Sequence, residues 1–146
     1  MKIKKIHHIL QNDGLFIAVI PAPSTLQELR IALDEATIEI EGGLRPRISP
    51  FIDIQDAGDL LYKAGFHTPI ADSEKVEISY NNMFSLLKDI KNSGESNILT
   101  TQNKAIANRK IFALATEIYA DKFTDKNGKI IATIELLTLI GWKKVL

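Results

Sequence analysis

The stretch that decides the fold is NDGLFIAVIP, residues 12–21. A polar turn leads into an apolar run, residues 15–20, and a proline ends it. A short apolar run with β-branched and aromatic residues is typical of a strand buried on both faces, as in a parallel sheet. Such a strand needs neighbouring strands on both sides and helices above and below. Because only a short basic and apolar segment and a turn precede it, we expect an upstream part of the sheet to be missing.

The composition is that of one globular domain: 146 residues, 45% of them hydrophobic, with 18 basic and 18 acidic side chains. This balanced charge provides no strong field to attract nucleic acid or an anionic membrane. No apolar run reaches the roughly 18 residues that span a bilayer, and we find no signal peptide, so we expect a cytoplasmic location. The lack of cysteine excludes disulfides and thiolate metal sites.

Apolar periodicity and turn residues outline the remaining elements. A hydroxyl cap at Ser24 or Thr25, with Gln27 or Glu28 three positions on, is expected to start one helix, which Gly42-Gly43 ends. Asp53 is expected to cap the next helix, and Asn81 or Asn82 the one after it. Strands separated by helical segments favour an α/β sheet layered with helices, and the last strand is expected to add antiparallel at an edge, giving a mixed sheet. We predict helices over residues 1–10, 24–41, 53–64, 81–93 and 104–123, and strands over 15–20 and 129–140. Residues 66–71 and 76–80 are also strand-like and could form two strands, or one strand with a kink at Asp72-Ser73.

Three polar features are candidates for a site, and each has a structural alternative. The basic turn around Arg47 could bind a carboxylate or phosphate, or its prolines could simply orient the next helix. The polar cluster at residues 92–97 could contact a ligand from a loop, or could be a helix C-cap followed by an N-cap. The adjacent His7 and His8 would point in different directions on a helix and have no nucleophile motif beside them, so we expect a surface or packing role.

Nucleotide-binding and nucleophile motifs are absent. The sequence contains no G-x-G-x-x-G segment, no P-loop and no serine-centred elbow. A Rossmann-like sheet binds its nucleotide at the glycine turn after its first strand. The chain therefore offers no cofactor-binding residue that its own motifs identify.

Several short motifs in this order resemble the second half of a class I S-adenosylmethionine-dependent methyltransferase. The resemblance covers nearly the whole chain and is nearest to the methyltransferase-like assembly factors of respiratory complex I. It is more distant to the malonyl-carrier-protein methyltransferases of biotin synthesis. The motifs are Asp13-Gly14-Leu15-Phe16, Ile48-Ser49-Pro50-Phe51, Gly94-Glu95-Ser96-Asn97 and Ile140-Gly141-Trp142-Lys143.

The resemblance implies an incomplete Rossmann-like sheet. Residues 15–20, 67–80 and 129–140 would be its fifth, sixth and seventh strands, the last one antiparallel. The whole chain, residues 1–146, would be the C-terminal part of one domain, and residues 81–123 would be a helical insertion that covers the substrate. A complete member has four further strands that hold S-adenosylmethionine, so we expect no cofactor bound by this chain alone and no activity of it alone.

Two classes of function follow from this resemblance. In the first, the chain supplies the substrate side of a methyltransferase, through Arg30, Arg47, Ser49, Glu95 and Asn97, and pairs with a separate N-terminal half, a split or truncated arrangement. Its substrate could be a protein, and the catalytic residues stay unassigned. In the second, it is a non-catalytic binding or complex I assembly-type protein that uses Met83, Phe84 and Phe112 as a surface, or a remnant that self-associates through the open sheet edge.

Overall fold

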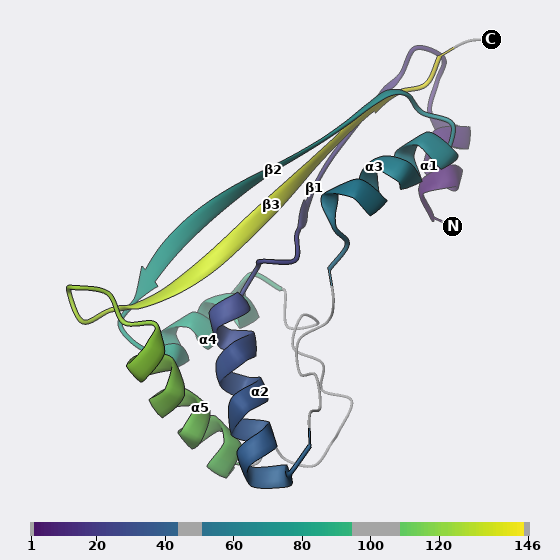
Figure 1. Ribbon diagram of the computed structural model, residues 1–146. Coiled ribbons are helices and arrows are strands. Elements are labelled where there is room, and N and C mark those ends of the chain that lie inside the picture. Colours follow the sequence, from purple (N-terminus) through teal and green to yellow (C-terminus); the bar gives the residue numbers. More distant parts are fainter. Residues whose placement is uncertain (1, 44–50, 95–108, 145–146) are drawn as a thin grey trace. The chain divides into compact units, whose positions relative to one another are not determined.

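A computed structural model describes residues 2–43, 51–94 and 109–144 of the chain (Figure 1). The described elements confirm the α/β class and the expected order of strands and helices. None of the described helices is long and apolar enough to cross a membrane. The elements are α1 (Lys2–Ile9), β1 (Leu15–Pro21), α2 (Gln27–Glu41), α3 (Ile54–Lys63), β2 (His67–Tyr80), α4 (Met83–Asn92), α5 (Arg109–Lys122) and β3 (Ile130–Trp142).

The three strands form one sheet in the order β1-β3-β2. β1 runs antiparallel to β3, in a register that pairs Leu15 with Trp142 and Pro21 with Leu136. The antiparallel orientation of the last strand is therefore confirmed, but its expected place at an edge is wrong. The composition of the strands explains the difference, since β3 is largely apolar and has buried residues along its length, whereas β2 is mostly exposed and carries charged residues that suit an edge.

β1 is not buried on both faces, contrary to the prediction from its apolar sequence. Its residues alternate: Leu15, Ile17 and Val19 are exposed, whereas Phe16 and Ala18 are half-buried against the core. β3 is its only strand partner in the described part of the chain. Successive side chains of a strand point to opposite faces of the sheet, so a strand that is covered on one face alternates between exposed and half-buried residues.

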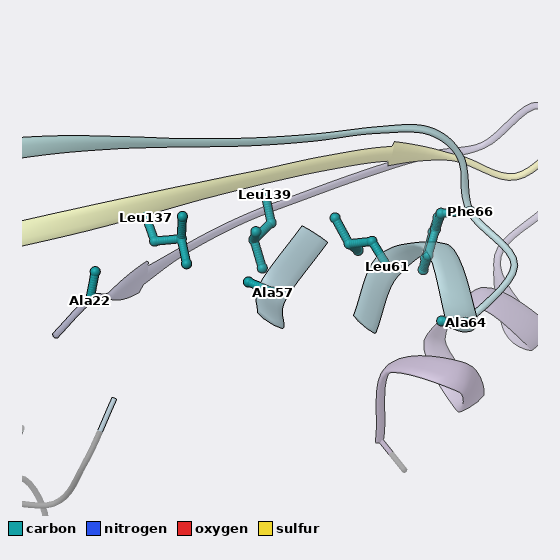
Figure 2. Close-up of a cluster of buried hydrophobic side chains, with 7 residues drawn as sticks. All are labelled: Ala22, Ala57, Leu61, Ala64, Phe66, Leu137 and Leu139. Atoms are coloured by element: carbon teal, nitrogen blue, oxygen red, sulfur yellow. The ribbon is translucent and has the colours of Figure 1, made fainter. Parts of the chain in front are cut away.

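The chain divides into two compact units, residues 1–25, 51–76 and 134–146 in the first and residues 26–50 and 77–133 in the second. The core of the first unit joins α3 to β3 (Figure 2). Figure 2 shows Leu137 and Leu139 pointing from β3 toward Ala57 and Leu61 of α3. Ile3 of α1 and Leu10, just after this helix, pack on the same cluster. The two helices therefore cover the same face of the sheet.

The second unit is built from helices that pack through apolar side chains. α2 lies against α5, and α4 contacts α5 where the Thr116 hydroxyl meets the Met83 sulfur at 3.5 Å. Lys122 of α5 forms an ion pair with Glu35 of α2 at 2.7 Å. The buried residues that these helices contribute are Leu29, Leu33, Ala36, Met83, Leu86, Ile90, Ile111, Ala115 and Tyr119.

The helix caps match the sequence pattern in two cases and differ in one. Asp53 accepts a hydrogen bond from the Asp56 N–H, and Asn82 accepts one from the Ser85 N–H, as N-caps do. The hydroxyl cap expected at the start of α2 is wrong, because the N-cap residue is Leu26, which has a positive φ of 55° and no side-chain cap. The Thr25 hydroxyl is engaged elsewhere, since it donates to the Glu135 carbonyl of β3.

Candidate functional site

The structure describes only one of the five predicted substrate-binding residues. Arg30 lies on α2, is half-buried, and its backbone N–H donates to the Leu26 carbonyl at 2.9 Å. The other four, Arg47, Ser49, Glu95 and Asn97, lie outside the described residues. The five-residue set therefore stays a prediction.

A buried carboxylate that sequence reasoning assigned to a helix cap lies in the second unit. Glu28, in the first turn of α2, is 5% exposed. Its two oxygens accept hydrogen bonds from the backbone N–H and the hydroxyl of Thr133 at the start of β3. Because both oxygens are occupied, this carboxylate fastens the helix to the strand and is not a free general base.

A second carboxylate ties β1 to β3 within the first unit. The Ser24 N–H donates to Oε2 of Glu135 at 2.8 Å, and the Thr25 hydroxyl exchanges hydrogen bonds with the Glu135 backbone. The Ser24 N–H holds the pKa of Glu135 below its ordinary value, with smaller help from the Lys75 charge. The side chain is thus a charged acceptor that fixes the end of β1.

Tyr119 and His7 have packing roles. Burial raises the pKa of Tyr119, whose hydroxyl donates to the Ile131 carbonyl at 2.8 Å. His7 packs edge-on against Phe66, with ring centroids 4.9 Å apart, which confirms the packing role expected for it. No group of three or more His, Asp or Glu side chains in the described part of the chain could hold a metal ion.

Of the surface expected for an assembly-type protein, only part is exposed. Phe84 is 70% exposed on α4, whereas Met83 beside it is 2% exposed and belongs to the packed interior of the second unit. Phe112 is half-buried on α5. Helical periodicity explains the split, because neighbouring residues on a helix face different directions.

The first unit has an open hollow. It occupies about 520 Å³ and is lined by residues of α3 and β2, among them Ile54, Tyr62 and Ala71. Asp59, the carboxylate that lines it, forms an exposed ion pair with Lys63 at 3.6 Å. Gln55, Asp59 and Tyr62 are its polar lining residues, and such an open hollow does not enclose a small ligand.

The most unusual feature of the described residues is a sheet in the first unit that the helices of this unit cover on one face only. β1 leaves one of its edges unpaired. On the face opposite α1 and α3, Ile17 and Val19 expose 58% and 56% of their surface. Trp142 of β3 exposes 45%. Unpaired strand edges and exposed apolar patches mark surfaces where another polypeptide binds.

The chain is similar to several known proteins along almost its whole length. The arginine-hydroxylase NDUFAF5, mitochondrial, of Rattus norvegicus is 38% identical over 141 residues, which are 97% of this chain and 41% of that protein. The human protein of the same name matches over the same shares, also at 38% identity. A malonyl-[acyl-carrier protein] O-methyltransferase of Laribacter hongkongensis is 29% identical over 97% of this chain and 45% of its own length.

The chain is homologous to part of these methyltransferase-like proteins. It spans less than half the length of each of the three relatives named above. No protein-family profile matches it. Among solved structures, the YcgJ protein of Bacillus subtilis aligns with 99% of this chain over 57% of its own length, at 14% identity and a TM-score of 0.48. The resemblance to complex I assembly factors and malonyl-carrier-protein methyltransferases is confirmed.

Proposed function

We propose that this chain is the C-terminal, substrate-side part of a methyltransferase-like protein and functions only together with a cofactor-binding part. The observation that carries the proposal is the partial match: 97% of this chain aligns with 41% of the rat relative. The remaining part of the relatives is where a cofactor site would lie. Among the residues that the structure describes, β1 has a strand partner on one side only, and this supports the proposal, because a further strand could pair on the other side.

The role of this part would be to position the acceptor. In methyl transfer, much of the rate comes from holding the acceptor in line with the reactive group of the cofactor. Arg30, Arg47, Ser49, Glu95 and Asn97 are the residues that we propose for this task. The cofactor of the complete protein would be S-adenosylmethionine, which a relative named as an O-methyltransferase supports.

A second candidate concerns the reaction itself. The rat and human relatives are named arginine hydroxylases, and they are more similar to this chain than the Laribacter methyltransferase is. The complete protein would then modify an arginine side chain of another protein. That substrate protein would be the link to a complex I assembly-type role. The cellular compartment differs as well: a cytoplasmic location stays a prediction for this chain, whereas these relatives are named as mitochondrial.

Cofactor binding by the reassembled protein tests the proposal. The part of the rat protein that lies outside the match, called the complementary part below, is produced with this chain, and S-adenosylmethionine binding is measured by calorimetry. We expect binding by the pair and none by this chain alone. Binding by this chain alone, or a stable pair that does not bind, would contradict the proposal.

The two reactions are separated by the product. An arginine-containing protein substrate is incubated with the pair, S-adenosylmethionine, dioxygen and a two-electron reductant. Methyl transfer replaces a proton of the substrate by the methyl group and adds a methylene to its mass, with S-adenosylhomocysteine as the other product. Hydroxylation inserts one oxygen atom from dioxygen, and the second oxygen atom is reduced to water. Mass spectrometry of the substrate distinguishes the two. A substrate of unchanged mass, with the cofactor bound, would favour the non-catalytic assembly role.

A further inference from the structure

The outer edge of β2 has no strand partner in the part of the chain that the structure describes. β3 lies between β1 and β2, so β2 is paired on one side only (Figure 1). Pro69, which has no N–H to donate to a neighbouring strand, is typical of such an edge strand. Residues 70–76 follow it within the first unit. They offer backbone N–H and C=O groups to an extended polypeptide beside them.

The hollow of the first unit lies beside this edge strand. Pro69 and Ala71 of β2 line it on one side. Asp59 and Tyr62 of α3 line it on the other side, with a carboxylate and an aromatic ring. A strand added at the edge of β2 would point every second side chain toward the face of the sheet that α3 covers. An open hollow suits such a side chain, because the neighbouring strand holds its backbone.

The lining of this hollow favours an arginine side chain. Tyr62 is 73% exposed, so its ring is accessible to a ligand. A guanidinium group is attracted to an aromatic ring and also pairs with a carboxylate. The Asp59 carboxylate forms an ion pair with Lys63 at 3.6 Å, and both side chains are about two-thirds exposed. Such an exposed pair is weak, so an incoming guanidinium can replace the lysine.

Acidic side chains of β2 favour a basic partner over a second copy of this chain. Asp72 and Glu74 are exposed, and they alternate with the residues that face α3. The one basic residue of this stretch is Lys75. Besides the Ser24 N–H, its charge lowers the pKa of Glu135, so this lysine already lies near a carboxylate. Two copies of β2 paired together would bring acidic groups near acidic groups, which is destabilising, whereas a basic segment is attracted.

Protection of the edge explains only part of this arrangement. Charges on an edge strand prevent aggregation, which accounts for Asp72 and Glu74. It does not account for the carboxylate and the accessible aromatic ring that line a hollow beside the strand. A binding site for an extended basic segment accounts for both, since main-chain pairing gives affinity and a pocket for alternate side chains gives specificity.

We propose that the outer edge of β2 and the hollow beside it bind an extended, arginine-rich segment of the protein substrate. The segment pairs with residues 70–76 as an added strand. One arginine side chain lies in the hollow against Asp59 and Tyr62, and basic residues on the other face lie near Asp72 and Glu74. The inference rests on the proposed function, which supplies a protein substrate and places the complementary part at the edge of β1.

A synthetic peptide tests this surface. Its roughly seven residues are pairs of arginine alternating with pairs of valine, so both faces of the extended peptide carry arginine. Binding of the labelled peptide to this chain is measured by fluorescence anisotropy. We expect saturable binding that weakens severalfold as salt is raised. N-methylation of alternate peptide amides should weaken it at least about tenfold, because main-chain hydrogen bonds are lost while the charges stay.

Matched substitutions locate the peptide. Asp59→Asn should weaken binding about threefold or more, whereas Asp56→Asn, which removes the same charge from an exposed residue of α3 outside the hollow, should weaken it less than about twofold. Tyr62→Ala should also weaken it about threefold, and Tyr62→Phe, which keeps the ring, less than about twofold. Val19→Lys repels a basic peptide from β1 and should leave the affinity unchanged. Far-UV circular dichroism confirms that the variants are folded.

The outcomes separate this inference from the proposed function. Peptide binding with these effects, without S-adenosylmethionine binding by the pair, supports the inference and overturns the proposed function. Cofactor binding by the pair, without peptide binding to the pair or to this chain, overturns the inference alone. The inference is also overturned if the N-methylated peptide binds equally well, if Asp56→Asn and Asp59→Asn weaken binding equally, or if Val19→Lys abolishes it.

Discussion

At the scale of single residues, close packing in the first unit leaves no room at Gly141. A Cβ atom added there would lie 2.8 Å from Cβ of Phe66, nearer than carbon atoms approach without a shift. Phe66 in turn is 3% exposed and packs against Phe16, with ring centroids 5.1 Å apart. The glycine that precedes Trp142 is therefore required for aromatic packing at this end of the sheet.

Replacement of this glycine should destabilise the chain. We expect Gly141→Ala to lower the free energy of unfolding by about 1–3 kcal/mol, the usual cost of an added methyl group in a filled space. The measurement is urea denaturation followed by Trp142 fluorescence. Gly43→Ala is the control, because a Cβ there meets nothing within 4 Å. Equal midpoints for the two variants would show that Phe66 yields without cost.

Tyr119 should make stability fall in alkaline solution. Burial raises its pKa above the ordinary value of 10.0, so the folded state keeps the phenol proton to higher pH than the unfolded state does. The contribution is fully present below pH 10 and is lost as the pH rises through the raised pKa. We expect Tyr119→Phe to reduce this alkaline loss, and to cost about 1 kcal/mol near neutral pH, because the hydrogen bond to the Ile131 carbonyl disappears.

The pH dependence of the unfolding midpoint checks this. Urea midpoints of the wild type and of Tyr119→Phe are compared at neutral pH and above pH 10. Tyr62→Phe is the control for removal of an exposed phenol group, since Tyr62 is 73% exposed. Parallel pH curves for the wild type and Tyr119→Phe would mean that the phenol ionises equally in the folded and unfolded states.

At the scale of elements, β1 has the features of an aggregation-prone edge. It is apolar along its whole length and pairs on one side only within the described residues. Natural edge strands are protected by charges, bulges or short length, and lysine is the commonest protection. β2, at the other edge, carries Asp72, Glu74 and Lys75 and matches that rule.

A lysine in β1 should therefore reduce self-association of the chain. We expect the wild type to form concentration-dependent oligomers in light scattering, and Val19→Lys to shift it toward monomer. Ile9→Lys on α1 adds the same charge at a residue that is 80% exposed and should have little effect. A wild-type chain that stays monomeric at all concentrations would contradict this prediction.

At the scale of the whole molecule, stability should depend on the complementary part. A partner that binds only the folded chain stabilises it by about 2.7 kcal/mol at a free concentration of 100 times its dissociation constant. We expect thermal unfolding of this chain to move upward as the complementary part is added. S-adenosylmethionine added to this chain alone should leave the unfolding temperature unchanged. An upward shift with the cofactor alone would show that this chain has a cofactor site of its own.

The sequence predicted features of the structure that depend on nearby residues, and it missed features that depend on residues far apart in the chain. The order of elements, the Asp53 and Asn82 caps and the glycine at the end of α2 follow from short-range patterns, and the structure confirms them. The start of α2 did not follow, because the Thr25 hydroxyl bonds to Glu135, a residue 110 positions away. Of the predicted substrate-binding residues, only Arg30 is described, so the sequence-based set remains untested.

The sequence by itself determined that residues 15–20 form an apolar strand suited to cover on both faces, because side-chain type and turn residues are encoded locally. It also carried the resemblance to methyltransferase-like proteins that the comparisons confirm. Only the tertiary structure decided that this strand lies at an edge beside β3, with Ile17, Val19 and Trp142 uncovered. The physical reason is that strand neighbours and covered faces are set by contacts between residues far apart in the chain, which local patterns do not encode.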